Sequence, residues 1–389
     1  MSDAEIHASH SVRVCAVGQD LFDGGAILTS LDLLEALQTR DIELDLFYIH
    51  RRGRYLDRLK IANPRTRVVF GNTTPRGKLV GSIVSVVKLM KLAWRAELIF
   101  AMNEGSATNL ASLVGSILRK PVIGWMHINW SEGSSFLPWW RRIPTPLLLR
   151  RCVHIVCCSH GVKNDLAENF QIPLEKLSYI PNPIDVEKIK ERAAEPIDIT
   201  LEQEGIKFSL LTVGGLRPQK NYETLIRSFK LVIDQGLSAQ LIIVGEGPKR
   251  VELEALITQL GISDRVRMVG QKANPYPYFR AADLFVLSSL YEGNPLVLIE
   301  ALIIGTPVIS TDCISGPREV LLDGELGALV PVNDVNALAK SIRAFLLDPN
   351  PDLPRAKVEE VVIPHQKEVV ADQFLALFKS AIRSYHHRE

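Results

Sequence analysis

The stretch Tyr291-Glu-Gly-Asn-Pro-Leu-Val-Leu-Ile-Glu-Ala-Leu302 follows a short apolar run at residues 284–288, which the pattern predicts to be a buried strand. Asn294 can cap a helix and Pro295 suits a first helical turn, so we expect a helix over residues 296–302. A strand that turns directly into a helix is the basic unit of a parallel α/β sheet.

Two carboxylates flank the start of this helix. Glu292 lies on the loop, and Glu300 lies inside the helix with its side chain leaning back toward the helix start. Free backbone amides at the start of a helix form a site for an anion. The residues expected to form it are Gly293, Asn294, Pro295 and Leu296. A ligand that carries both hydroxyls and phosphate suits this combination, and a sugar nucleotide is such a ligand.

The composition is that of an ordinary soluble globular protein, with 389 residues, 47% of them hydrophobic and 23% charged. This length suffices for two domains with full cores. The net charge of +1 gives no indication of nucleic acid, which we do not expect as a partner. The first ten residues lack the apolar core of a signal peptide, and no run of about 18 apolar residues could cross a membrane. We therefore expect a cytoplasmic protein.

The cysteines are odd in number and their spacing does not resemble a metal site. We expect all of them to be reduced thiols in the core, and the run at residues 152–158 to be a buried strand. The five are Cys15, Cys152, Cys157, Cys158 and Cys313.

Short apolar strands alternate with helical patterns along the whole chain. The first series of expected strands covers residues 12–17, 44–48, 67–70, 97–101, 122–127 and 155–159. The second series covers residues 209–213, 240–244, 266–269, 284–288, 307–310 and 328–330. Two series of this kind indicate two doubly wound domains, each a parallel sheet with helices on both faces. We expect the boundary in the polar, proline-containing segment at residues 181–200.

The pattern Glu-Gly-x-Pro-x-x-x-x-Glu-Ala, which begins at Glu292, resembles the signature of family 4 of the retaining glycosyltransferases. The resemblance implies the GT-B fold, in which two Rossmann-like domains face each other across a cleft. Residues 1–185 would form the acceptor-side domain, and residues 186–366 would bind the nucleotide sugar. The helical pattern at residues 367–385 would cross back onto the N-terminal domain.

The loop Val213-Gly-Gly-Leu-Arg-Pro-Gln-Lys-Asn221 resembles the family's donor loop, Gly-Arg-Leu-x-x-x-Lys, whose two basic side chains hold the diphosphate. Lys220 matches the family's lysine. Gly215 stands where the family has arginine, and Arg217 is the candidate to replace it. A basic, solvated turn would show the same residues, so both readings of Arg217 stay open at this point.

Two further segments carry the donor-side resemblance. Ser315-Gly-Pro-Arg-Glu319 resembles a run that begins another helix near the donor sugar, which makes Gly316 a candidate contact. Val269-Gly-Gln-Lys-Ala273 corresponds to the backbone stretch that pairs with the base, with Gln271 at its centre. The resemblance favours uridine as the nucleoside.

In the N-terminal half, Gly24 and Gly25 resemble the family's Gly-Gly-Ala-Glu element, although Ile27 stands where glutamate is usual. A dinucleotide fingerprint would need Gly-x-Gly-x-x-Gly, so NAD binding is disfavoured. His127 ends an expected strand, and strand ends face the ligand in such sheets. The resemblance implies that His127 contacts the donor sugar, whereas a histidine bonded to a neighbouring loop is the structural alternative.

The resemblance implies a retaining transferase that moves a hexose or N-acetylhexosamine from a UDP-sugar to a glycan or lipid-linked glycan, as in polysaccharide or lipopolysaccharide biosynthesis. No Asp-x-Asp motif lies near the donor loops, so we expect no metal and no cofactor besides the UDP-sugar substrate. A phosphorylase or epimerase that uses the same fold is one alternative. A binding homologue with weak catalysis is another, and Gly215 is its best support.

Residues 78–95 place their polar side chains on one helical stripe, which includes Lys78, Lys88, Lys91 and Arg95. A basic amphipathic helix can lie on an anionic bilayer, or it can cover a sheet with its basic face in solvent. Trp139-Trp-Arg-Arg142 adds aromatic and basic residues suited to a membrane interface. We therefore expect peripheral contact with the inner face of the cell membrane, with the sheet-covering helix as the alternative.

Overall fold

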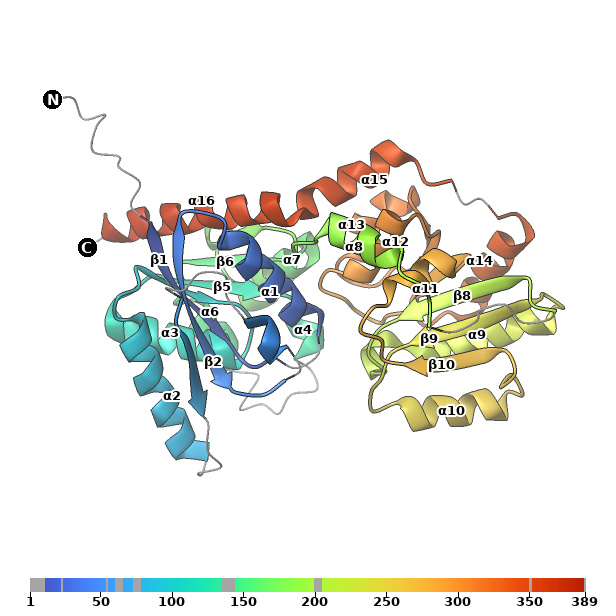
Figure 1. The fold of residues 1–389 in the computed structure, drawn as a ribbon, viewed down its shortest axis with the longest axis horizontal. Helices are drawn as coiled ribbons and strands as arrows, with labels where there is room; N and C mark the ends of the chain where they lie inside the picture. The colour runs from blue at the N-terminus through green and yellow to red at the C-terminus, as the bar shows by residue number, and fades with distance from the viewer. Residues whose placement is uncertain are drawn as a thin grey trace. The chain divides into compact units, whose positions relative to one another are not determined.

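The computed structural model describes residues 11–21, 24–53, 55–59, 66–72, 78–134, 144–198, 205–349 and 352–387. The chain forms two compact units (Figure 1). The first consists of Met1–Ile184 together with His365–Glu389, and the second of Asp185–Pro364.

The first unit is built on a parallel sheet of seven strands within the described residues, in the order β3-β2-β1-β4-β5-β6-β7. Its strands are β1 Val12–Gly18, β2 Ile42–His50, β3 Val68–Asn72, β4 Leu98–Ala101, β5 Val122–Met126, β6 His154–Cys157 and β7 Leu177–Tyr179. Its helices are α1 Gly25–Leu37, α2 Lys78–Ala93, α3 Ser106–Leu118, α4 Trp130–Gly133, α6 Pro144–Leu149, α7 His160–Phe170 and α16 Lys367–His386. Short 3₁₀ turns lie at η1 Leu56–Leu59 and η2 Leu174–Lys176, and a third, η5 Ile363–His365, spans the boundary between the two units.

Side chains of β1 alternate between two buried cores, because successive residues of a strand point to opposite faces. Val14 and Ala16 belong to the core shared with α1 and α16. Cys15 and Val17 belong to the core shared with α2, α3 and α7. Helices therefore cover both faces of the sheet, as a parallel sheet requires.

The C-terminal helix α16 is part of the first unit. Phe374 and Phe378 are fully buried, and their rings lie 5.4 Å and 5.2 Å from the ring of Phe100 on β4. Helix α16 also packs beside α1. The last segment of the chain thus completes the core of the sheet formed by the first residues.

The second unit contains a parallel sheet of six strands among the described residues, in the order β10-β9-β8-β11-β12-β13. Its strands are β8 Phe208–Val213, β9 Ala239–Val244, β10 Val266–Gly270, β11 Leu284–Leu287, β12 Val308–Thr311 and β13 Ala328–Val330. Its helices are α8 Val186–Ala193, α9 Tyr222–Asp234, α10 Arg250–Gln259, α11 Tyr276–Ala281, α12 Leu296–Ile304, α13 Pro317–Val320, α14 Val335–Leu347 and α15 Arg355–Val362. The 3₁₀ turns are η3 Pro218–Lys220 and η4 Leu322–Gly324.

Several local expectations are wrong. Asn294 does not cap α12: the helix begins after Pro295 without a side-chain cap, and the Asn294 carbonyl accepts from the Leu296 amide at 3.0 Å. Strand β5 ends at Met126, so His127 follows the strand instead of ending it. The cysteine-rich run is a strand only over His154–Cys157. The five cysteines are nevertheless free and buried, as expected.

Strand β7, Leu177–Tyr179, was not expected, because three residues centred on a serine carry almost no apolar pattern. Within the part of the chain that the structure describes, no helix combines the length and the apolar character that crossing a bilayer requires.

Candidate functional site

The strand order of the second unit reverses direction at β8. Strand β9 lies on one side of β8 and β11 lies on the other, so the connections after β8 and β11 leave the sheet in opposite directions. In open α/β sheets, ligands bind at such a switch point, beyond the carboxyl ends of the strands. The two loops at this point are residues 214–221 and residues 288–295.

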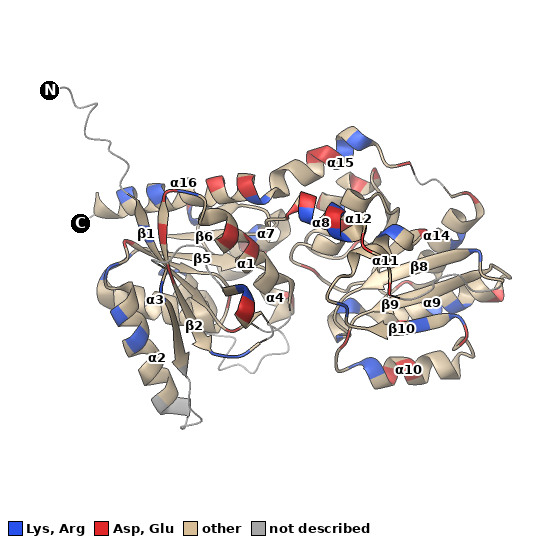
Figure 2. Ribbon diagram, in the orientation of Figure 1, with Lys and Arg blue, Asp and Glu red and all other residues tan. Residues whose placement is uncertain are grey.

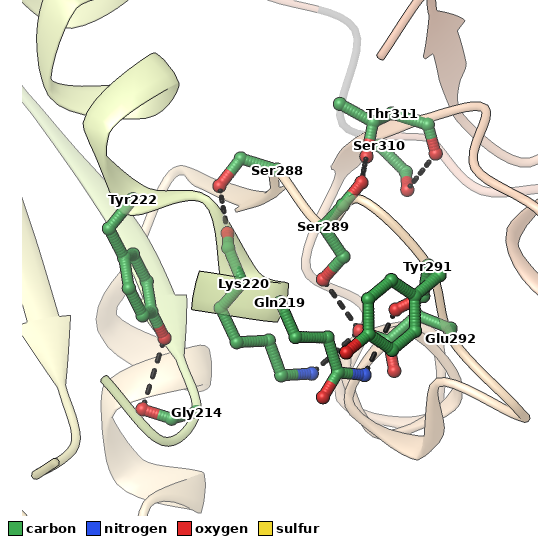
Figure 3. Close-up of polar contacts among 10 residues, drawn as sticks. All are labelled: Gly214, Gln219, Lys220, Tyr222, Ser288, Ser289, Tyr291, Glu292, Ser310 and Thr311. Atoms are coloured by element: carbon green, nitrogen blue, oxygen red, sulfur yellow. Dashed lines mark hydrogen bonds and ion pairs between the residues drawn. The ribbon is translucent and has the colours of Figure 1, made fainter. Parts of the chain in front are cut away.

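An ion pair joins the two loops at the switch point (Figure 3). Lys220 Nζ lies 2.6 Å from Glu292 Oε1, and Ser289 Oγ donates a hydrogen bond to the same oxygen at 2.6 Å. The Lys220 side chain is 18% exposed and the Glu292 side chain 7% exposed. Two opposite charges held this far from water need each other, because removing either one leaves a buried charge without its partner.

Hydrogen bonds from side chains to backbone carbonyls also hold these two loops together (Figure 3). Gln219 Nε2 donates to the Tyr291 carbonyl at 2.9 Å, and Ser288 Oγ donates to the Lys220 carbonyl at 2.8 Å. Thr311 Oγ1, at the end of β12, donates to the Ser289 carbonyl at 2.7 Å. These bonds make the ion pair part of a rigid arrangement, so its charges are positioned before any ligand arrives.

Two close backbone approaches complete the loop cluster. A Cβ at Gly245, just after β9, would lie 1.9 Å from the Gly214 carbonyl oxygen. Gly316 has φ 105°, and a Cβ there would lie 2.3 Å from Pro295 Cδ. Both positions therefore require glycine, and Gly316 brings the loop after β12 against the start of α12.

Glu300 lies on α12, where the Tyr276 hydroxyl donates to its Oε1 at 3.3 Å. The amide of Glu292 donates to the Ile314 carbonyl at 3.2 Å, and the Leu296 amide is engaged by Asn294. The amide of Leu296, which was expected to bind an anion, is therefore already bonded within the loop.

Gln271, the residue expected to lie beside the base, is exposed and directly follows β10.

His127 is buried at the carboxyl edge of the sheet of the first unit. Its Nε2 lies 2.9 Å from the Met102 carbonyl oxygen, and its backbone amide donates to Glu104 Oε2 at 3.2 Å. Burial lowers the pKa of His127, so the ring is neutral near pH 7. A carbonyl only accepts, so the proton of the neutral ring lies on Nε2 and Nδ1 is left as an acceptor.

Gly24 and Gly25 lie at the start of α1, where Gly24 occupies the N-cap position. A Cβ at either glycine would meet no atom within 4 Å among the described residues. The backbone here is therefore open to a ligand rather than packed against its own fold. Asp20, on the same loop, forms an ion pair with Arg52 after β2 at 3.1 Å.

Two family models match the chain, one in each half. The model of Glycosyl transferases group 1 matches residues 198–360, and the model of Glycosyltransferase Family 4 matches residues 23–188. The chain belongs to glycosyltransferase family 4. The predicted family is confirmed.

Curated relatives match one half of the chain. A Campylobacter jejuni protein named N-acetylgalactosamine-N,N'-diacetylbacillosaminyl-diphospho-undecaprenol 4-alpha-N-acetylgalactosaminyltransferase is 38% identical over 191 residues, 49% of this chain and 50% of the relative. An Escherichia coli UDP-Gal:alpha-D-GlcNAc-diphosphoundecaprenol alpha-1,3-galactosyltransferase is 28% identical over 199 residues, 49% and 51% of the two chains. The matched region therefore spans about half the length of these relatives.

Solved structures match almost the whole family 4 chain. HepE of Anabaena in complex with UDP has a TM-score of 0.76 at 19% identity, covering 95% of this chain and 100% of its own. Sucrose-phosphate synthase of Thermosynechococcus elongatus has a TM-score of 0.75 at 21% identity, covering 96% and 100%. The likeness confirms the predicted GT-B fold of two Rossmann-like parallel sheets.

The family 4 donor loop departs from its pattern at Gly215, and the Arg217 side chain lies beside this position: a Cβ at Gly215 would lie 3.6 Å from Arg217 Nε. Arg217 is exposed and lines a surface hollow of about 480 Å³ between α9 and α10, together with Lys249 and Glu252. That hollow does not include Lys220 or Glu292. The structure thus brings Lys220 to the switch point, and the replacement of the family's arginine by Arg217 stays a prediction.

Three polar residues of these loops were not among the predicted site residues. Ser289 and Gln219 hold the donor loops together, and Glu104 bonds the amide of His127. Their positions in the sequence could have identified them as site residues, because each lies within three residues of a strand end or of a predicted site residue. Among the residues that the structure describes, no group of three or more His, Cys, Asp or Glu side chains could hold a metal ion.

Proposed function

We propose that the chain is a retaining glycosyltransferase that moves a hexose or N-acetylhexosamine from a UDP-sugar to a hydroxyl of a lipid-linked glycan in cell-surface polysaccharide synthesis. The observation that carries the proposal is the Lys220–Glu292 pair at the switch point of the second sheet. Support for the substrate class comes from relatives named for transfer to diphosphoundecaprenol-linked sugars and from HepE complexes with UDP and UDP-glucose.

Lys220 is the group proposed to hold the diphosphate. An ammonium has three donors, and only one is used by Glu292 in this arrangement. The other two can donate to phosphate oxygens while the ion pair stays intact. The ion pair and the backbone bond from Ser288 fix the direction of this cation before the donor binds.

Glu292 is proposed to bind the hydroxyls of the transferred sugar. Both hydrogen bonds that it accepts from Lys220 and Ser289 go to Oε1. Its Oε2 can therefore accept from sugar hydroxyls without competing with the lysine. Glu300 is proposed to hold the ribose diol, with Tyr276 orienting its carboxylate through the 3.3 Å hydrogen bond.

In the proposed reaction, the bond between the anomeric carbon and the β-phosphate oxygen breaks, and negative charge develops on that oxygen. Lys220 stabilises this charge in place of a metal ion. The acceptor hydroxyl forms its bond to the anomeric carbon on the same face, and its proton passes to the departing phosphate. The sugar becomes oxocarbenium-like between these events, by analogy with glycoside cleavage. The contact between His127 and the sugar stays a prediction.

A direct experiment is to incubate the purified protein with a panel of UDP-sugars and a diphospholipid-linked acceptor. We expect release of UDP and a product whose anomeric configuration, read by NMR, equals that of the donor. An inverted product would contradict retention. Transfer from a nucleotide sugar with another base, but from no UDP-sugar, would contradict the donor assignment.

A catalytically weak binding protein is the second candidate, because Gly215 stands where the family has arginine. Such a protein would bind UDP but would release none from any UDP-sugar. Measuring binding and turnover on the same preparation separates the two candidates.

A further inference from the structure

Three neighbouring helices of the first unit expose large apolar side chains. Helices α2 and α3 are in contact, and so are α3 and α6. More than half of the large apolar side chains that are exposed in the described residues belong to these helices or directly follow them. They are Ile83, Val84, Val87, Trp94, Leu113, Ile117 and Leu147, which we call the apolar face.

Helix α2 shows why these side chains point outward. Its buried side consists of Gly81, Ser85, Leu89, Leu92 and Ala93, and it packs beside β3. Leu89, Leu92 and Ala93 join the core of the sheet, whereas Ile83, Val84 and Val87 lie on the other side of the helix and face solvent. The expected polar stripe is divided: Ser85 is buried and Lys88 turns toward the sheet, whereas Ser82, Lys91 and Arg95 are exposed.

Lys88 confirms this orientation. Its Nζ donates to the Phe70 carbonyl at 2.9 Å and to the Gly71 carbonyl at 3.0 Å, at the edge strand β3. Lys88 thus holds the helix to the sheet and is not available to a partner. The other predicted membrane contacts, Lys91 and Arg95, are exposed. The described side chains do not include Lys78, and Trp139-Trp-Arg-Arg142 lies outside the described residues.

Basic residues lie at the ends of the helices that form the apolar face, and one of them, Arg95, lines a hollow together with Glu43 and Asp45. Helices α2, α3 and α6 contain no Asp or Glu, and Figure 2 shows blue but no red on α2. Each of the three helices is followed by basic residues: Arg95 after α2, Arg119 and Lys120 after α3, and Arg150 and Arg151 after α6. Cations at helix ends complement the helix dipole, but that effect does not explain why apolar side chains lie exposed beside them.

We propose that the apolar face docks on the surface of an anionic lipid bilayer. Exposed aliphatic side chains and Trp94 would enter the boundary between headgroups and acyl chains, and the basic residues would meet lipid phosphates. The exposed basic residues at the ends of the three helices are complementary to lipid phosphates, and no acidic side chain within these helices opposes them. The inference rests on the proposed function in one respect, since a lipid-linked acceptor would be presented at that surface.

Vesicle flotation tests the proposal with the full chain. Wild-type protein should float with vesicles that contain phosphatidylglycerol, should bind pure phosphatidylcholine less, and should be released by high salt. Ile83→Ser/Trp94→Ser removes side chains that are 57% and 71% exposed, and binding should weaken by at least about tenfold. The matched control is Leu347→Ser/Val251→Ser in the second unit, where the side chains are 56% and 76% exposed, and its binding should equal that of wild type.

A charge-reversal pair tests the basic rim. Lys91→Glu/Arg95→Glu should weaken binding to anionic vesicles about thirtyfold or more, since each basic residue near the surface contributes on the order of 1 kcal/mol. The control, Lys340→Glu/Arg343→Glu, reverses two exposed charges on α14 and should bind as wild type does.

UDP binding, measured on the same proteins, keeps this proposal separate from the proposed function. Variants of the apolar face should bind UDP as wild type does, so loss of vesicle binding alone supports the proposal. Wild-type protein that ignores anionic vesicles at low salt would overturn it. So would a dimer in solution that Ile83→Ser/Trp94→Ser converts to a monomer, because the apolar face would then be an interface between two copies.

Discussion

The two sheets of this protein share a topology but differ at their switch points. In the second unit, the loops after β8 and β11 are joined by the buried Lys220–Glu292 ion pair. In the first unit, the strand order reverses between β1 and β4, and the edge near this point holds the neutral ring of His127 and open glycine backbone. The second unit thus places a buried ion pair at its switch point, whereas the first unit places a neutral imidazole and open backbone there, with the Glu104 carboxylate and the Asp20–Arg52 ion pair nearby. A diphosphate suits the first arrangement, and a neutral sugar suits the second.

The largest expected effect is at Lys220. Lys220→Met removes the cation proposed to stabilise the departing UDP, and kcat should fall about 10²–10³-fold, which corresponds to about 2.7–4 kcal/mol of barrier. Arg217→Ala should lower kcat far less, because Arg217 lines the hollow between α9 and α10. Lys249→Ala, in the same hollow, is the matched control. Equal losses for Lys220→Met and Arg217→Ala would show that the arginine does replace the missing loop residue.

Glu292 and Glu300 should divide the donor between them. Glu292→Gln keeps the shape of the side chain and the Ser289 contact but removes the charge, so transfer should slow by more than UDP affinity changes. Glu300→Gln should weaken UDP binding more than it lowers kcat, since Glu300 is proposed to hold the ribose. Calorimetric titration with UDP and steady-state kinetics on both variants measure the two effects. An equal loss of UDP affinity in both variants would contradict the division.

Ser289 is expected to act through Glu292 as a positioning residue. Ser289→Ala removes one of the two hydrogen bonds to Glu292 Oε1, and kcat should fall about fifteenfold, at the lower end of the usual range of about 1.5–3 kcal/mol for a hydrogen bond to a charged group. KM for the donor should change less than kcat. Ser289→Thr keeps the hydroxyl and should restore most of the activity. If Ser289→Ala and Ser289→Thr behave alike, the hydroxyl does not position the carboxylate.

The smallest effect expected is a difference in acid stability between the two units. All nine histidines belong to the first unit, and burial lowers the pKa of His127, His50 and His154. The unfolded chain takes up protons near the ordinary pKa of about 6.5, whereas the folded unit takes them up only at lower pH. The contribution to stability is therefore complete above about pH 6.5 and is lost as the pH falls below it.

Hydrogen exchange followed by mass spectrometry can compare the units at several pH values. After correction for the intrinsic exchange rate, protection in the first unit should decline below about pH 6.5, while protection in the second unit stays constant over that range. His127→Gln should make the decline smaller. A parallel decline in both units would mean that these histidines do not cause it.

Strand–helix alternation predicted the fold, and the family motifs predicted the donor loops. Both signals are local in sequence, as the Glu292–Glu300 spacing shows. Lys220 and Glu292 could be chosen individually, but their pairing could not, because 72 residues separate them and only the fold brings them together. Spacing also predicted a polar and an apolar stripe on residues 78–95. It could not say how each stripe divides between the sheet and solvent: Lys88 contacts the edge strand, whereas Lys91 and Arg95 are exposed.

The central claim is that the switch point of the second unit grips the diphosphate through Lys220. The most direct measurement compares the affinities of wild-type protein and Lys220→Met for UDP and for uridine by calorimetry. We predict that wild type binds UDP much more tightly than uridine, and that Lys220→Met loses most of this preference while its affinity for uridine is unchanged. A variant that keeps the full preference for UDP would contradict the claim.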